Sequence, residues 1–249
     1  MKFSIIIPNF NDKRIKATLE SVFCQSYTNF EVIVVEGCVE NNNTKSIYED
    51  YDICLIHDKD NGIFDALNKG IKKSEGDIIY LMGSDDYLSD PEVLKSVSKK
   101  IKNDDKIDGV CIGCEFANAD NKIIRKWYPS NISSKKMMLG ILPPHFSLFL
   151  KREVYDLNGL FDQSFSHTLA VDILWMLDLA MKKQNLKIQT LSNHHLVMGY
   201  GGTSTGSFST VIKQFRIVHN YAKKKKMRYW PFISIVRTSS KLAQFRPFS

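Results

Sequence analysis

Acidic and amide side chains follow four apolar runs of the sequence, each at the point where the run ends. They are Asn9 and Asn11, then Glu36, then Asp58 and Asp60, and then Asp85 and Asp86. If the runs are strands of one open parallel sheet, their carboxyl ends meet at the edge where such sheets bind ligands. Carboxylates gathered there repel one another unless a cation or a ligand hydroxyl lies between them. The spacing therefore predicts a binding site in which Asp85 and Asp86 hold a diphosphate through a divalent cation, Mn or Mg.

The hydrophobic pattern indicates which elements position these residues. Short apolar runs at 4–7, 32–35, 53–56 and 78–82 alternate with apolar stripes of helical spacing at 15–24 and 63–71. This alternation predicts an α/β fold with a mostly parallel sheet flanked by helices. Beyond residue 103 the pattern changes to an antiparallel pair (109–116 with 123–127), a strand at 146–150 and a helix from about 170 to 183. We expect one compact unit with a basic C-terminal appendage.

Basic residues are concentrated at the C-terminal end. The chain of 249 residues has a formal net charge of +7, and thirteen Lys and Arg residues follow Asp178, the last acidic residue. Such a segment favours an anionic partner, either phospholipid, lipid diphosphate or nucleic acid. Four consecutive lysines, 223–226, precede Trp230 and an apolar stretch, which a membrane interface can bury and a phosphate backbone cannot use. We therefore expect an anionic membrane surface and no nucleic acid.

The sequence lacks the signals of several other classes of protein. No apolar stretch approaches the roughly 20 residues that span a bilayer, and the N-terminal run is too short for a signal peptide. Five scattered cysteines do not indicate a disulfide framework, so the cytoplasm is the expected compartment. There is no Walker sequence, and no GxGxxG follows the first strand, which disfavours a nicotinamide enzyme.

Three blocks near the N-terminus resemble the opening of family 2 glycosyltransferases of the GT-A fold. The blocks are residues 5–11, 21–27 and 30–37, and residues 60–71 are similar to the subgroup that builds bacterial colanic-acid-like and O-antigen polysaccharides. The resemblance implies a Rossmann-like GT-A domain at 1–206, with a donor half at about 1–116 and an acceptor half at about 117–206 that includes a small antiparallel part. Residues 207–249 then form a basic amphipathic extension.

The activity implied by this resemblance is an inverting, metal-dependent sugar transfer. The donor would be a nucleotide-diphosphate sugar, with a UDP-sugar favoured. The acceptor would be a hydroxyl of an undecaprenyl-diphosphate-linked saccharide, in the synthesis of a bacterial surface polysaccharide such as O-antigen. Such an enzyme would work as a peripheral protein on the inner face of the plasma membrane.

On the donor side, the resemblance assigns roles to the residues that follow the strands. The implied donor-binding residues are Pro8, Asn9, Asn11, Glu36, Asp60, Asn68 and Asp85. Asp85 and Asp86 fall on the family's acidic metal motif. Glu36 stands where the family usually has Asp, and Gly83 stands where many members carry a further Asp.

On the acceptor side, residues 143–147 and 159–162 resemble segments of the family that face the acceptor, and Asp172 matches the position of the catalytic base. His145 and the loop glycines Gly201 and Gly202 are implied to contact the acceptor or to cover the donor. Judged from the residues alone, Asp172 could instead cap a helix, and His145 could be a core histidine.

Two other functions stay open at this point. A nucleotidyltransferase that makes sugar nucleotides could share the layered fold, and it would release pyrophosphate where a glycosyltransferase releases UDP. A non-catalytic RNA-binding module could use the basic segment, but it would leave the acidic strand ends without a purpose. Metal-dependent titration with a sugar nucleotide separates this last class from the two enzymes.

Overall fold

The structure is a computed structural model that describes residues 1–39, 43–118, 120, 122–128, 130–165, 168, 170–199 and 208–242. The strands are β1 (Phe3–Asn9), β2 (Phe30–Glu36), β3 (Cys54–His57), β4 (Ile78–Leu81), β5 (Tyr87–Leu88), β6 (Gly109–Ala117), β7 (Ile123–Trp127), β8 (Ile132–Ser133), β9 (Leu148–Lys151) and β10 (Lys187–Met198). The helices are α1 (Ile15–Phe23), α2 (Lys45–Tyr48), α3 (Ile63–Lys73), α4 (Val93–Asn103), α5 (Ser134–Met138), α6 (Arg152–Asn158), α7 (Val171–Lys182), α8 (Phe208–Lys224) and α9 (Trp230–Leu242).

The strands form one sheet in which most of the main strands point the same way. Their order is β3-β2-β1-β4-β9-β6-β10-β5, with β7 paired to β6 and β8 paired to β10. β3, β2, β1 and β4 are parallel neighbours, and β9 runs antiparallel to both β4 and β6. β6 and its parallel neighbour β10 therefore point in the same direction as β1. The predicted antiparallel pair at 109–116 and 123–127 is confirmed as β6 and β7.

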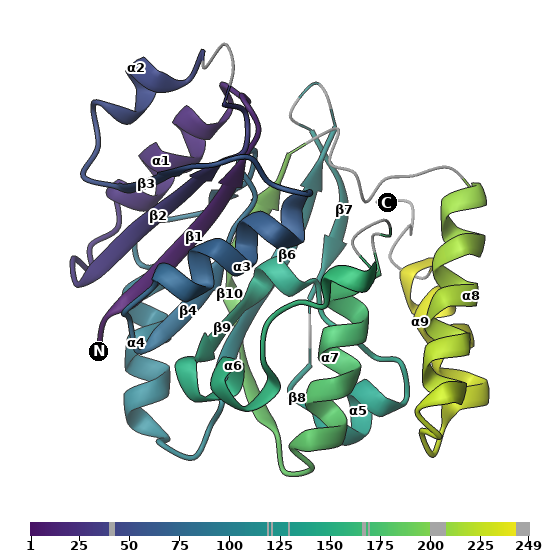
Figure 1. Cartoon of the computed structure of the whole chain (residues 1–249). Coiled ribbons are helices and arrows are strands. Elements are labelled where there is room, and N and C mark those ends of the chain that lie inside the picture. The colour runs from purple at the N-terminus through teal and green to yellow at the C-terminus, as the bar shows by residue number, and fades with distance from the viewer. Residues whose placement is uncertain are drawn as a thin grey trace.

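Both faces of the sheet are covered by helices (Figure 1). Successive side chains of a strand point to opposite faces. Ile6 of β1 accordingly packs in the core shared with α3, α6 and α7, whereas Ile5 and Ile7 pack in the core shared with α1 and α4. Burial on both faces explains why these strands are continuous apolar runs in the sequence.

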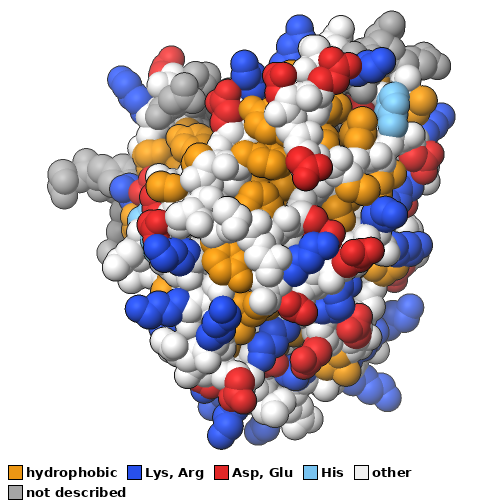
Figure 2. Space-filling model, turned by 90° about the vertical axis from the view of Figure 1, so that its left-hand side faces the viewer, with side chains coloured by type: hydrophobic (Ala, Val, Ile, Leu, Met, Phe, Trp, Pro, Cys, Tyr) orange, Lys and Arg blue, Asp and Glu red, His pale blue; other side chains and the backbone are white. Residues whose placement is uncertain are grey.

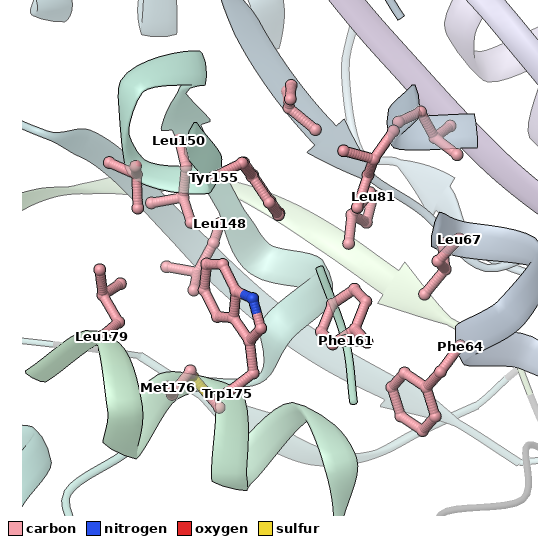
Figure 3. Close-up of a cluster of buried hydrophobic side chains, with 14 of the residues drawn as sticks. Phe64, Leu67, Leu81, Leu148, Leu150, Tyr155, Phe161, Trp175, Met176 and Leu179 are labelled. Atoms are coloured by element: carbon pink, nitrogen blue, oxygen red, sulfur yellow. The ribbon is translucent and has the colours of Figure 1, made fainter. Parts of the chain in front are cut away.

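An aromatic group in the first of these cores connects α3 to α7. Figure 3 shows Trp175 of α7 beside Phe161, with Phe64 of α3 on the other side of Phe161. The ring centroids are 5.7 Å apart for Trp175 and Phe161 and 5.2 Å apart for Phe161 and Phe64. The side chain of Asn68 fixes the same contact, because its Nδ2 donates to the Phe161 carbonyl at 2.8 Å and its Oδ1 accepts from the Phe161 amide at 2.9 Å. The loop that contains Phe161 is thereby tied to α3.

The basic C-terminal segment folds as a helical pair, α8 and α9, that lies side by side at one edge of the molecule (Figure 1). Its buried side chains join α7 in a third core cluster, whose members are Ala170, Ile173, Leu174, Leu177, Val218, Ala222, Met227 and Ile233. The predicted boundary at residue 206 stays a prediction. Within the part of the chain that the structure describes, no helix has both the length and the apolar character needed to cross a membrane.

Candidate active site

A cavity of about 700 Å³ opens at the carboxyl ends of β1 and β4. Its wall brings together these predicted site residues: Pro8, Asn9, Asp60, Asp85, Asp86, His145 and Asp172. The described wall does not include Asn11, Glu36 or Asn68. Gly201 and Gly202, predicted to cover the donor, lie outside the described residues. Residues predicted to bind the donor and residues predicted to face the acceptor thus share one cavity.

The carboxylate of Glu36 is buried and organises the loops behind this wall. It accepts hydrogen bonds from Asn9 Nδ2 at 2.8 Å, Tyr48 Oη at 2.8 Å and Thr44 Oγ1 at 3.0 Å. It also accepts from the backbone amides of Asn11 and Cys38, each at 3.0 Å. Burial raises the pKa of Glu36, but these hydrogen bonds outweigh burial and lower the pKa below its ordinary value. An ionised Glu36 therefore holds Asn9 in the wall, while its predicted contact with the nucleotide stays a prediction.

Asn11 forms the turn that follows β1. Its backbone has a φ of +55°, in the left-handed region that asparagine adopts more readily than most residues. Its Oδ1 accepts from the amide of Asn43 at 2.8 Å, which ties the turn to the start of α2. These local features suit an asparagine at this position, and the role of Asn11 as a donor ligand remains a prediction.

Asp60 approaches the backbone at the end of β2 very closely. A Cβ at Gly37 would lie 1.9 Å from Asp60 Oδ2, so any larger residue there would force this carboxylate to move. The other oxygen, Oδ1, accepts from the amide of Gly62 at 2.8 Å, just before α3 begins. The carboxylate is thus fixed between β2 and α3 on the cavity wall.

The acidic pair after β4 is the most strongly perturbed part of the wall. Asp86 is 2% exposed and accepts from the amides of Gly83 at 3.2 Å and Gly199 at 3.3 Å. Burial, and next the charge of Asp85, raise the pKa of Asp86 to about 7. Burial also raises the pKa of Asp85, although the Arg14 guanidinium, whose Nη1 lies 3.0 Å from Asp85 Oδ2, opposes the rise. The charge of Asp85 disfavours ionisation of Asp86, and a cation bound between the two carboxylates would relieve this repulsion.

The oxygen ligands of this pair fit a divalent metal that is shared with a substrate. Magnesium is commonly bound by one or two carboxylates together with substrate phosphates and water. Among the described residues there is no group of three or more His, Cys, Asp or Glu side chains arranged to hold a metal. A metal at Asp85 and Asp86 would therefore take its remaining ligands from the substrate and from water. The glycine at position 83 gives Asp86 space, since a Cβ there would lie 2.7 Å from Asp86 Oδ2.

Asp172 lies in the first turn of α7, on the cavity wall. The helix begins at Val171 with Ala170 as its N-cap, so Asp172 is inside the helix and is not the cap. Its Oδ1 accepts from the amide of Ile173 at 2.8 Å. Asp172 therefore lies at the positive end of the helix dipole. The position suits a group that takes up a proton, and its assignment as the base is a prediction.

His145 is a buried histidine at the edge of the cavity. Its ring packs edge-on against Phe161 and Trp175, with centroids 5.2 and 5.1 Å away, and its Nε2 lies 3.3 Å from the Tyr155 hydroxyl. Burial lowers the pKa of His145 to about 3, so the imidazole is neutral at physiological pH. These contacts are those of a core histidine, the alternative that the sequence left open for His145. The residue also lines the cavity.

Three arginines on the wall were not predicted from the sequence: Arg14, Arg125 of β7 and Arg237 of α9. The Arg125 guanidinium lies 3.4 Å from the centre of the Phe116 ring. Each arginine comes from a different part of the chain, and none lies in a recognisable motif. Only the fold brings these three arginines to the cavity wall that also holds the acidic groups.

The family of this chain is decided by comparison of its sequence with protein-family models. The model described as glycosyl transferase family 2 matches residues 4–156, a span that runs from β1 through the acidic pair to α6. This chain belongs to glycosyl transferase family 2. The expected family is thereby confirmed, while the polysaccharide subgroup stays a proposal.

Relatives and solved structures extend the comparison. An uncharacterized glycosyltransferase of Rickettsia felis is 24% identical over 98% of this chain, which covers 43% of that protein. The crystal structure of Staphylococcus aureus TarS 1–349 in complex with UDP-GlcNAc superposes with a TM-score of 0.68 at 21% identity, over 89% of this chain and 66% of that one. The mannosyltransferase PcManGT of Pyrobaculum calidifontis, solved with GDP-Man and Mn²⁺, has a TM-score of 0.63 at 14% identity, over 97% and 75% of the two chains.

These similarities establish the fold of this family 2 member. It is the mixed α/β GT-A fold, with helices on both sides of a mostly parallel sheet, as predicted. The chain spans less than half the length of the Rickettsia relative that it matches.

Proposed function

We propose that this protein transfers a sugar from a nucleotide-diphosphate sugar, with a UDP-sugar favoured, to a hydroxyl group of an acceptor. One observation carries the proposal: a single cavity has the acidic pair Asp85 and Asp86 on its wall together with Asp172 of α7. The TarS structure that shares this fold holds UDP-GlcNAc, which supports a UDP-sugar as donor.

In the proposed reaction, the acceptor hydroxyl attacks C1 of the sugar as the bond from C1 to the diphosphate breaks. Asp172 accepts the proton of the attacking hydroxyl, and a single displacement inverts the anomeric configuration. Asp60 and Asn9 orient the donor from the ends of the strands. A divalent cation, Mn or Mg, held by Asp85 and Asp86 would supply positive charge to the leaving diphosphate. The neutral His145 contacts the acceptor without exchanging a proton.

We further propose that the acceptor is a saccharide linked to undecaprenyl diphosphate, in the synthesis of a bacterial surface polysaccharide of the O-antigen type. The C-terminal helices support this proposal. Lysines 223–226 are exposed at the end of α8 and in the turn that follows it, and Phe232 and Ile235 of α9 are 59% and 52% exposed. Charged and apolar groups side by side suit an anionic membrane interface, here the cytoplasmic face of the plasma membrane.

The sequence places Trp230 beside the apolar stretch expected at the membrane interface, but in the structure its ring packs against the rest of the molecule. Its ring packs edge-on against His219 at 5.1 Å and is partly buried in the cluster that joins α8 and α9 to α7. The exposed apolar contact of this surface therefore comes from Phe232 and Ile235.

The test of the donor proposal is calorimetric titration of the protein with UDP- and GDP-sugars, with Mn²⁺ and with a chelator. We expect saturable binding of a UDP-sugar that is lost with the chelator and weakened in Asp85→Asn. Binding of RNA without binding of any sugar nucleotide would favour the RNA-binding alternative. Equal affinity in the presence of chelator would contradict the metal assignment.

A further inference from the structure

Helix α9 reaches from the outer surface of the molecule to the wall of the cavity. Its residue Ile233 is fully buried among Ala170, Ile173 and Leu174 at the start of α7. One turn further along α9, Arg237 lines the cavity, as does Asp172 in the first turn of α7. The same packing contact thus carries a basic and an acidic group to one wall.

A glycine fixes how closely α9 approaches. Gly140, after α5, has a φ of +89°, and a Cβ at this position would lie 2.3 Å from the carbonyl oxygen of Ile233 and 3.2 Å from the backbone nitrogen of Arg237. The backbone of α9 therefore rests directly on this turn. This contact fixes the backbone position of Arg237 and so the point from which its side chain extends into the cavity wall.

Electrostatics couple the two side chains. Burial lowers the pKa of the Arg237 guanidinium, and the charge of Asp172 raises it again. Arginine remains charged throughout the physiological pH range. A partly buried cation is costly unless an opposite charge compensates for it, and Asp172 supplies that charge.

We propose that Arg237 is a positioning residue that holds the Asp172 carboxylate ionised and oriented for the acceptor hydroxyl. This inference rests on the proposed function, in which Asp172 takes up the acceptor proton. It makes α9 part of the catalytic site as well as of the membrane-facing surface. The guanidinium acts through Asp172 and does not itself exchange a proton.

The kinetic test uses Arg237→Ala, Arg237→Lys and the control Arg228→Ala. Arg228 belongs to the same basic segment, but it is exposed, and its guanidinium lies 5.4 Å from the centre of the Tyr229 ring. We expect Arg237→Ala to lower kcat about 10- to 100-fold, because loss of orientation has effects of this size. KM for the acceptor and Kd for the donor should stay within about twofold of the wild-type values, because the proposed role of the guanidinium is to position Asp172 and not to bind either substrate. With a short soluble acceptor, whose use needs no membrane docking, Arg228→Ala should have the wild-type kcat.

Two further readouts separate positioning from a merely structural role. Millimolar guanidinium chloride should restore part of the kcat of Arg237→Ala, and Arg237→Lys should retain part of it. In the background of Asp172→Asn, the change Arg237→Ala should lower kcat no further, because Arg237 acts through Asp172. A raised acceptor KM with unchanged kcat, or additive losses in the double variant, would overturn the proposal.

A stability cycle keeps this test independent of the transfer reaction. Urea unfolding of wild type, Asp172→Asn, Arg237→Met and the double variant measures the coupling of the two charges. We expect non-additivity of at least about fivefold in the unfolding equilibrium constant. Additive effects would overturn the pairing even if transfer is observed. Strong coupling in a protein that transfers no sugar would show that the proposed function had failed while the pairing held.

Discussion

The buried carboxyl of Asp86 makes the stability of the metal-free protein depend on pH. Its pKa is about 7 in the folded state, against an ordinary value of 3.8. Below pH 3.8 both states are protonated. Between pH 3.8 and 7 the unfolded chain loses the proton while the folded protein keeps it, so stability falls as pH rises. The loss reaches at most about 4 kcal/mol above pH 7, at 1.36 kcal/mol per pKa unit.

We therefore predict that Asp86→Asn raises the Tm of the chelated protein at pH 8 relative to wild type. At pH 4 it should not raise the Tm, because the amide loses one of the two backbone hydrogen bonds and gains nothing. Thermal unfolding at both pH values measures this, with the exposed Asp105→Asn as the matched control. A Tm difference between Asp86→Asn and wild type that is the same at both pH values would contradict the assignment.

Among the individual residues of the cavity wall, the sequence identifies the acidic ones better than their basic partners. Asp60, Asp85 and Asp172 each follow a strand or begin a helix, so a local pattern reveals them. Arg14 and Arg237 lie in no motif, and only tertiary packing carries them to the cavity. Glu36 could be recognised as important, but the five hydrogen bonds that it accepts depend on loops that no local pattern specifies.

At the scale of elements, the turn at Gly140 sets the position of α9. We predict that Gly140→Ala displaces α9, destabilises the protein by about 1–3 kcal/mol and lowers kcat, because both the positive φ and the close carbonyl of Ile233 oppose a Cβ. Donor affinity should stay unchanged, because the residues proposed to bind the donor lie at the end of β1 or after β3 and β4 and do not belong to α9.

Gly159→Ala is the matched control for this prediction. Gly159 has a similar φ of +85°, but a Cβ there would have no atom within 4 Å. Both variants carry backbone strain, but only Gly140→Ala places a Cβ against the backbone of α9, so it should lower kcat more than Gly159→Ala does. Urea unfolding and steady-state kinetics of the two variants provide the comparison. Equal kcat values would show that the position of α9 does not matter for turnover.

The apolar β-runs and amphipathic helices of the first hundred residues were predictable because burial on both faces leaves a strong periodic signal. Strand β10 could not be predicted in this way, because its sequence mixes polar and apolar residues. Its polar side chains find partners far away in the chain: His194 Nδ1 lies 2.7 Å from Asp90, and Gln189 donates to Asp104 at 2.9 Å. An irregularity between Leu191 and His195 also breaks the alternation. Tertiary contacts, and not the local sequence pattern, therefore determine that residues 187–198 form a strand.

For the whole molecule, the distribution of charge predicts how the protein meets a membrane. On the face turned toward the viewer in Figure 2, acidic and basic side chains are interspersed. Figure 2 views the molecule from the left-hand side of Figure 1, whereas α8 and α9 lie on the right. The mixed face offers no field of one sign to an anionic surface, so the lysines at 223–226 should dominate docking.

We predict that replacing lysines 223–226 with Ser weakens binding to phosphatidylserine-containing vesicles at least about 100-fold, at about 1 kcal/mol for each lysine. Phe232→Ser with Ile235→Ser should weaken it further by removing apolar contact. Sedimentation with vesicles measures the binding, and Lys99→Ser with Lys102→Ser, exposed on α4, is the control. Unchanged sedimentation, or salt-sensitive binding to RNA alone, would refute the docking surface.

The most direct test of the central claim is the identity of the nucleotide released when the protein meets a UDP-sugar, Mn²⁺ and a lipid-diphosphate-linked acceptor. The proposed site predicts one UDP for each sugar transferred, measured by chromatography, and a product with inverted anomeric configuration. Asp172→Asn should lower kcat about 100- to 10,000-fold while its donor affinity stays the same. Release of pyrophosphate, or full turnover by Asp172→Asn, would contradict the account.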